Sequence, residues 1–212
     1  MLKVYGFSRV NKIARGNTRD LRVLWALEEM GLPYEIVGMD HPKHDLDAAE
    51  FRAKNPFGQI PVLEDDGAVL TESGAIVLYL ARKSGKLIPS DLAGEGQVLR
   101  WSIAALNSIE PPVLTHWFVG MVGDKDSKAH GALGKWSEMR LGQLEGWLAN
   151  RTYIATDDFT VADLLMTHVL LVPENLGMLA SHPNLRAYRA RCLDRPAWKK
   201  TLDAYNARVE AA

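Results

Sequence analysis

The chain has 212 residues, of which 47% are hydrophobic and 24% are charged, an ordinary composition for a globular protein with a buried core. The formal net charge of −1 gives no electrostatic reason to expect a nucleic acid or a membrane surface as partner. One cysteine, Cys192, excludes an internal disulfide, and the usual metal-binding spacings are absent, so we expect no metal. The first residues lack a signal-peptide pattern, and no apolar run approaches the ~20 residues of a membrane span. We therefore expect a cytoplasmic protein.

The first part of the chain alternates between strand and helix patterns. The predicted elements are, in chain order, a strand over 2–7, a helix over 17–30, a strand over 32–39, a helix over 45–54, a hairpin of strands 60–65 and 68–72, and a helix over 73–84. The dipeptide Asp66-Gly67 supplies the hairpin turn, and Asn17 or Thr18 can cap the first helix. The resulting order is β-α-β-α-β-β-α.

The rest of the chain has a different character. The segment 83–93 is polar and contains Gly, Pro and Ser, which predicts a linker. Every later pattern is helical, with no convincing strand. We therefore predict an α/β domain over 1–82 and an all-helical domain over 94–212. In the second domain, Thr160 and Asp163 are spaced as a capping box, and Pro111-Pro112 should kink or interrupt a helix.

Pro61 stands at the start of a strand-like run, where its missing N–H needs an explanation. A cis Ile60-Pro61 bond would leave the backbone N–H and C=O of Ile60 to pair with an extended peptide. The ordinary alternative is a trans proline that opens an edge strand, because only about 5–6% of X-Pro bonds in folded proteins are cis. The spacing alone favours the trans bond.

Glu72 and Ser73 stand where the helix over 73–84 should begin. The first N–H groups of a helix, together with the Ser73 hydroxyl, favour a bound carboxylate, and Glu72 beside them would suit an ammonium group. Such a pair would hold the zwitterionic end of an amino acid. The alternative is a plain helix cap with a solvated glutamate.

Four stretches of the chain resemble the cytosolic glutathione transferase superfamily, in its bacterial type. The stretch "NPFGQIPVLEDDGAVLTESGAIVLYL" resembles the glutathione-binding segment, and "RVLWALEEMGLPYE" resembles the first helix and second strand. The stretches "FTVADLLMTHVL" and "HPNLRAYRARCLDRPAW" resemble helices of the second domain. The resemblance implies a thioredoxin-like N-terminal domain followed by an all-α domain, glutathione as co-substrate, and a homodimer.

The resemblance also implies roles for individual residues. It implies that Pro61 is cis, that Ile60 pairs through its backbone with the cysteine of glutathione, and that Glu72 and Ser73 take the γ-glutamyl end. Family members bind the glycine carboxylate with a Lys, His, Gln or Arg around the Asn-Pro motif. The candidates for this last role are Lys43, His44, Lys54 and Gln59.

The expected chemistry is activation of the glutathione thiol. A free cysteine thiol has a pKa of about 8.5 and is mostly protonated at neutral pH. The positive end of the first helix and a hydroxyl or amide donor at the sulfur would lower that pKa, and the thiolate would attack an electrophilic carbon, a peroxide or a disulfide. In many relatives a serine precedes the arginine at position 22 by four residues. Thr18 has that place here, and Asn17, Tyr5 and Ser8 are the other candidates.

The electrophile is expected to bind against the first loop and the first long helix of the second domain. His116, Trp117, Phe118 and Met121 offer apolar surface there, although an ordinary core role is the alternative. The loop contains no cysteine, which disfavours chemistry through a protein thiol. The predicted function is a glutathione transferase for small hydrophobic electrophiles. The alternatives are a glutathione-dependent peroxidase or reductase, and a non-catalytic binding or regulatory protein.

Overall fold

The structure is a computed structural model that describes residues 1–123 and 125–211, with the backbone alone for Ala211. The chain forms two compact units, Met1–Lys86 with Arg195–Ala212, and Leu87–Asp194. The predicted domains were 1–82 and 94–212 with a linker over 83–93, so the difference lies at the C-terminal end of the chain. Residues 195–212 belong with the first unit.

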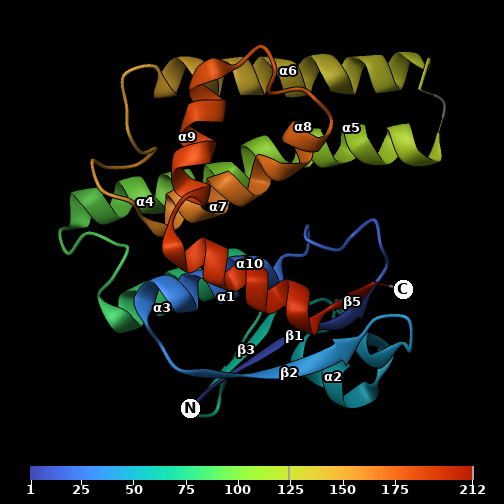
Figure 1. Cartoon of the computed structure of the whole chain (residues 1–212), viewed down its shortest axis with the longest axis vertical. Coiled ribbons are helices and arrows are strands. Elements are labelled where there is room, and N and C mark those ends of the chain that lie inside the picture. The colour runs from blue at the N-terminus through green and yellow to red at the C-terminus, as the bar shows by residue number, and fades with distance from the viewer. Residues whose placement is uncertain (124, 212) are drawn as a thin grey trace. The chain divides into compact units, whose positions relative to one another are not determined.

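The first unit is an α/β layer structure with a mixed sheet (Figure 1). Its elements are β1 (Leu2–Val10), α1 (Asp20–Met30), β2 (Tyr34–Asp40), α2 (Ala49–Lys54), β3 (Val62–Asp65), β4 (Ala68–Leu70), α3 (Ser73–Ser84), α10 (Pro196–Arg208) and β5 (Glu210–Ala211), with a 3-10 turn at Asp45–Asp47. The strand order is β2-β1-β3-β4, in which β1 and β2 are parallel and the other neighbours are antiparallel. This arrangement confirms the predicted thioredoxin-like fold.

The strand β5 corrects the expectation that no strand follows the linker. It pairs in parallel with Arg9 and Val10 at the end of β1. Two residues are too few to produce a period-two pattern, so this strand could not be predicted from alternation. The same pairing shows that β1 is longer than the predicted strand over 2–7.

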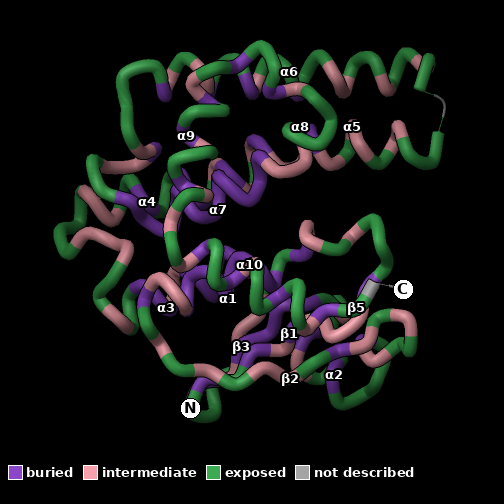
Figure 2. The backbone as a smooth tube through the Cα atoms, viewed as in Figure 1, coloured by how far each residue is buried: buried purple, intermediate pink, exposed green. Residues whose placement is uncertain are grey.

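Buried residues alternate with less buried ones over the first six residues of β1, because successive side chains of a strand point to opposite faces of the sheet. Figure 2 shows the backbone coloured by burial. Val4 is buried on the face covered by α1 and α3, whereas Tyr5 and Phe7 face the opposite side, where Phe51 of α2 completes a core cluster. Helix α10 packs on α1, since the rings of Trp25 and Trp198 lie 4.8 Å apart. Each face of the central strand is therefore fixed by its own set of helices.

Within residues 87–123 and 125–194, the regular secondary structure of the second unit is entirely helical, as predicted. Its elements are α4 (Leu92–Ala104), α5 (Glu110–Val122), α6 (Lys128–Leu148), α7 (Val161–Val169), α8 (Leu171–Asn175) and α9 (Pro183–Leu193). A π-helical segment at Ala105–Ile109 joins α4 to α5, just before Pro111 and Pro112. Prolines donate no backbone hydrogen bond, so the expected interruption takes this form. The capping box of Thr160 and Asp163 is confirmed at the start of α7.

Candidate functional site

The registers of β3 bring three segments to one edge of the sheet. In the antiparallel pairs, Val62 lies opposite Tyr5 of β1, and Leu63 lies opposite Leu70 of β4. Residues just before β3 are therefore level with the carboxyl end of β1 and with the residues that follow β4. We call Ile60, Pro61, Glu72 and Ser73 the β3 edge.

The bond between Ile60 and Pro61 is cis, as the family resemblance implied. The Ile60 side chain is buried in the core cluster beside Phe51, while its backbone precedes Val62, the first residue of β3. Asn55 stabilises the backbone just before Ile60, because its Nδ2 donates to the carbonyl of Gln59 at 2.8 Å. Ile60 is thus anchored by its side chain, with its backbone beyond the first ladder position of β3.

Glu72 and Ser73 mark the transition from β4 to α3. Glu72 is exposed and has φ 66° and ψ 110°, a conformation that non-glycine residues rarely adopt and that is often found at functional sites. Ser73 is buried, and its Oγ accepts a hydrogen bond from Nη1 of Arg22 at 3.2 Å. A hydroxyl that accepts one hydrogen bond can still donate its own hydrogen. Ser73 can therefore donate to an acceptor at the start of α3.

The N-terminus of α1 lies at the same place as that of α3. The backbone N–H of Phe7, near the end of β1, donates to Oδ2 of Asp20 at 3.0 Å and holds the first residue of α1 to the sheet. The bond from Arg22 to Ser73 then ties the first turn of α1 to that of α3. Because a helix N-terminus carries partial positive charge, this corner of the unit favours an anion.

Thr18, the first candidate for thiol activation, lies just before α1 and is 7% exposed. Its Oγ1 is 2.8 Å from the hydroxyl of Tyr205, and it is also hydrogen-bonded to the carboxylate of Asp20. Asn17 is half-buried, and its Nδ2 donates to the carbonyl of Ile13 at 3.4 Å. The cap position of α1 is Arg19, one residue after Thr18 and two residues after Asn17. Neither Thr18 nor Asn17 therefore caps the helix, contrary to the expectation.

Tyr5 and Ser8 lie on β1. The Tyr5 hydroxyl donates to Glu64 Oε1 at 2.9 Å, and the same oxygen accepts from Lys54 Nζ at 2.5 Å. Burial and the Glu64 carboxylate raise the pKa of Tyr5, so its hydrogen is engaged within the protein. Ser8 lies at the irregularity in the pairing of β1 with β2, next to Gly38. Thr18 is thus the candidate hydroxyl that directly adjoins a helix N-terminus.

The candidates for the glycine carboxylate have different surroundings. Lys43 pairs with Asp40 at 3.4 Å and His44 pairs with Asp47 at 3.0 Å, both on exposed turns. Lys54 is bound to Glu64 on the α2 side of the sheet. Gln59 is exposed and directly precedes Ile60, so it is the candidate that is adjacent in sequence to the β3 edge.

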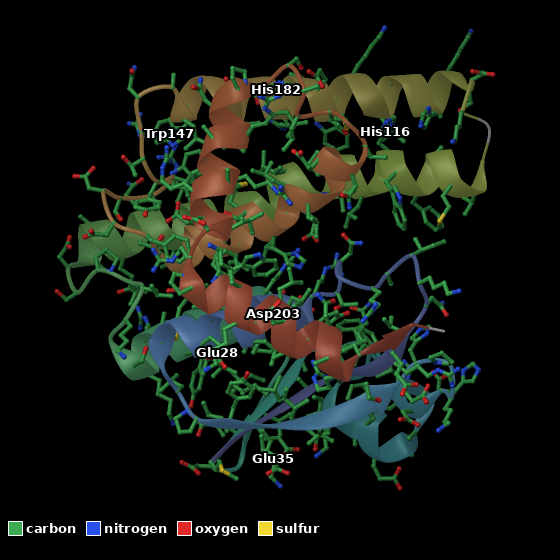
Figure 3. All side chains as sticks on the ribbon, viewed as in Figure 1. Glu28, Glu35, His116, Trp147, His182 and Asp203 are labelled. Atoms are coloured by element: carbon green, nitrogen blue, oxygen red, sulfur yellow. The ribbon has the colours of Figure 1, made fainter. Side chains whose placement is uncertain are left out.

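The predicted electrophile residues lie on α5 of the second unit. The ring of His116 stacks on that of His130, with centroids 4.2 Å apart, so His116 is engaged with α6 (Figure 3). Trp117 is half-buried and Met121 is exposed. These two are four residues apart and share a side of the helix. Their role toward a substrate stays a prediction.

Sequence reasoning missed three buried polar residues of the first unit, Arg22, Asp20 and Tyr205. Arg22 precedes Trp25 and Ala26 by three and four residues, so the helical period places it on the apolar face, and that was the available signal. Tyr205 gave no signal, because it is 187 residues from its partner Thr18. No group of three or more His, Cys, Asp or Glu that could hold a metal is found among the described residues. Within the same residues, no helix is both long and apolar enough to cross a membrane.

Comparison with known proteins relates most of the chain to one protein family. Residues 13–82 match the family model "Glutathione S-transferase, N-terminal domain", and residues 110–196 match the corresponding C-terminal domain. Glutathione S-transferase 3 of Zea mays is 31% identical over 96% of this chain and 94% of its own length. Glutathione S-transferase GstB of Escherichia coli K12 is 30% identical over 89% of this chain and 95% of its own.

Solved structures agree with these sequence matches. A glutathione transferase of Burkholderia graminis, crystallised with two glutathione molecules per subunit, has a TM-score of 0.83 and 29% identity, and the match covers 96% of this chain and 88% of that one. A glutathione transferase of Pseudomonas putida with bound glutathione disulfide has a TM-score of 0.81 and 26% identity, over 95% and 90% of the two chains. The fold, both domain models and these relatives together establish that the chain belongs to the glutathione S-transferase family.

Proposed function

We propose that this protein binds glutathione at the β3 edge and transfers it to small hydrophobic electrophiles. The observation that carries the proposal is the meeting of the Ile60 backbone, the Glu72-Ser73 pair and the N-termini of α1 and α3 at one corner of the first unit. Related proteins of known structure contain bound glutathione or glutathione disulfide, which supports the choice of ligand.

Each part of the tripeptide has a suitable partner. The backbone of Ile60 pairs with the cysteine residue as an added strand would. The γ-glutamyl carboxylate accepts from Ser73 and the first N–H groups of α3, while Glu72 takes the ammonium group. Gln59 supplies an amide donor for the glycine carboxylate. Charged and polar ends of the ligand are thereby matched by groups of the opposite character.

Thr18 is the proposed donor to the sulfur, and Asn17 is the second candidate. The position of Thr18 just before α1 combines a hydroxyl with the positive end of a helix of 11 residues. Each unit by which the thiol pKa falls corresponds to about 1.4 kcal/mol in favour of the thiolate. The side of α5 that carries Trp117 and Met121 is the proposed surface for the electrophile. A homodimer and a cytoplasmic location stay predictions.

Parallel turnover assays test the reaction. We expect the protein to conjugate glutathione to a chlorodinitrobenzene-type electrophile faster than it reduces an organic hydroperoxide. Turnover of the hydroperoxide alone would instead identify a peroxidase. Retention on immobilised glutathione without turnover of either substrate would identify a binding protein.

A further inference from the structure

The loop over residues 11–18, between β1 and α1, carries the two leading candidates for thiol activation, Asn17 and Thr18. Part of its hydrogen bonding is local, since the backbone N–H of Asn17 donates to the carbonyl of Ala14 at 2.9 Å. Thr18 is the one buried residue of the loop, and Ile13 is 68% exposed. A segment with few buried apolar contacts opens at a low cost in free energy. The position of the loop therefore depends on its hydrogen bonds to the rest of the first unit.

Arg15 attaches this loop to the C-terminal end of α10. Its Nη2 donates to the carbonyl of Asn206 at 2.9 Å, and its Nε donates to the carbonyl of Val209 at 3.0 Å. The last carbonyls of a helix have no partner within the helix, and this end of the helix carries partial negative charge. A guanidinium suits both properties, because it is positively charged and holds several donors in one plane.

Tyr205, on the same helix, holds the residues that follow Arg15. The backbone N–H of Gly16 donates to the Tyr205 hydroxyl at 3.4 Å, and Oγ1 of Thr18 lies 2.8 Å from the same oxygen. The Tyr205 side chain is buried, so its hydroxyl has a fixed position in the first unit. We call Tyr205, Asn206 and Val209 the α10 end.

The α10 end is itself attached to the central strand of the sheet. The guanidinium of Arg208 donates to the carbonyl of Phe7 in β1. Directly after the helix, β5 pairs with the end of β1, where Glu210 lies opposite Arg9 (Figure 1). Val209, between these two contacts, is buried. The loop that leaves β1 is therefore bonded to a segment that is held against β1.

We propose that Arg15 is a positioning residue for thiol activation. By attaching the loop to the α10 end, Arg15 fixes Asn17 and Thr18 just before the N-terminus of α1, from where one of them donates to the sulfur of glutathione. This inference rests on the proposed function. It holds for either donor, because both residues follow Arg15 within three positions of the chain. Arg15 itself exchanges no proton in the reaction.

This role concerns the thiol and not the affinity for glutathione. The proposed partners of the peptide backbone and of the γ-glutamyl end belong to the β3 edge, which Arg22 ties to α1 through Ser73. Loss of the Arg15 bonds should let the loop move while the β3 edge keeps its place. The rate depends steeply on the position of the donor, because a misplacement of about 1 Å can cost about 100-fold. A change at Arg15 should therefore lower kcat and leave the Kd for glutathione nearly unaltered.

Arg15→Ala tests this directly. The pKa of the bound thiol, measured by thiolate absorbance, should rise toward the ordinary value of about 8.5, and kcat with a chlorodinitrobenzene-type electrophile at neutral pH should fall about tenfold. The Kd for glutathione, measured by calorimetry, should change less than about twofold. Lys12→Ala is the matched control, because it removes a positive charge from another exposed position of the same loop, and it should leave the thiol pKa and kcat unchanged.

Two further measurements address the attachment itself. Tyr205→Phe removes the acceptor of the Gly16 N–H, and it should raise the thiol pKa as Arg15→Ala does. Combined with Arg15→Ala it should add less than the sum of the two effects, since both changes release the same loop. Amide hydrogen exchange gives a readout that is independent of turnover. The Gly16 N–H should exchange about tenfold faster in Arg15→Ala, and at the unaltered rate in Lys12→Ala.

The outcomes distinguish the positioning role from the proposed function. If Thr18→Ala or Asn17→Ala raises the thiol pKa whereas Arg15→Ala leaves it unchanged, the positioning role is wrong and the proposed function stands. An equal effect of Lys12→Ala would assign the change to lost charge, and would also contradict the role of Arg15. The same holds if Arg15→Ala weakens glutathione binding as much as it slows turnover. If the unaltered protein binds no glutathione, both the role and the function are wrong.

Discussion

Arg22 on α1 donates a hydrogen bond to Ser73, the first residue of α3, with 3.2 Å between Nη1 and Oγ. Both residues are buried, at 2% and 5% exposed. A buried guanidinium therefore lies behind the hydroxyl that we propose as a donor to the γ-glutamyl carboxylate. Its charge adds to the positive ends of the two helices.

The first prediction concerns Arg22→Lys. A lysine keeps the charge but lacks the fixed fork of the guanidinium, so Ser73 should lose its orientation. We expect the Kd for glutathione to rise several-fold and the free energy of unfolding to fall by about 1–3 kcal/mol. Arg19→Lys, an exposed change just before α1, is the control. In a double-mutant cycle with Ser73→Ala, additive effects on Kd would show that Arg22 does not act through Ser73.

The second prediction concerns Glu72→Gln, which keeps the size of the side chain and removes its charge. Loss of the partner of the ligand ammonium should raise the Kd for glutathione about tenfold or more, as the loss of a charged hydrogen bond of about 1.5–3 kcal/mol implies. The effect should weaken at high salt, because Glu72 is exposed. Glu35→Gln, an exposed change on β2, should bind like the unaltered protein. An unchanged Kd for Glu72→Gln would assign the ammonium to another group.

The third prediction concerns Asp163→Ala in the capping box of α7. The carboxylate accepts from the N–H groups of Ile154 and Thr160 at 2.8 and 2.9 Å and from the Tyr188 hydroxyl at 3.0 Å. Leaving these buried donors without an acceptor should lower the free energy of unfolding by about 2–5 kcal/mol, measured by denaturant titration. The folded variant should keep its affinity for glutathione. Asp157→Ala, on the exposed loop before α7, should cost little.

The fourth prediction concerns pH and Asp65. Hydrogen bonds from Lys83 at 2.5 Å and Tyr79 at 2.7 Å lower the pKa of Asp65. A carboxyl group whose pKa is lower in the folded than in the unfolded state stabilises the fold above the unfolded value of about 3.9, and this stability is lost as pH falls through the folded value. Asp65→Asn should therefore lower the melting temperature at pH 7.

The difference between Asp65→Asn and the unaltered protein should then shrink as pH falls below about 4. Asp66→Asn, next to it and exposed, is the control and should show a small difference at every pH. A difference for Asp65→Asn that grows in acid would contradict the assigned direction of the pKa shift.

Local patterns were sufficient for much of the first unit. Period-two strands, the Asp66-Gly67 turn and the start of α3 at Ser73 all follow from neighbouring residues. The cis bond between Ile60 and Pro61 does not, because the spacing alone favours a trans bond, and it was expected only from the family resemblance. The capping box of Thr160 and Asp163 is likewise a four-residue signal.

Packing between elements that are distant in the sequence produces no comparable local pattern. The place of α10 on α1 depends on Trp25 with Trp198 and on Glu29 with Arg195, pairs that are distant in the sequence. The surroundings of Thr18 depend in the same way on Tyr205. A single sequence shows which residues have polar groups, but not which of these meet when separate elements pack together.

Calorimetric titration of glutathione into the protein and into Ser73→Ala tests the central claim most directly. The account predicts saturable binding by the unaltered protein and a Kd about tenfold or more higher for Ser73→Ala, because a hydrogen bond to the ligand carboxylate is lost. Ser84→Ala, at the other end of α3, should bind like the unaltered protein. No heat of binding with the unaltered protein, or equal affinity for Ser73→Ala, would contradict the proposed site.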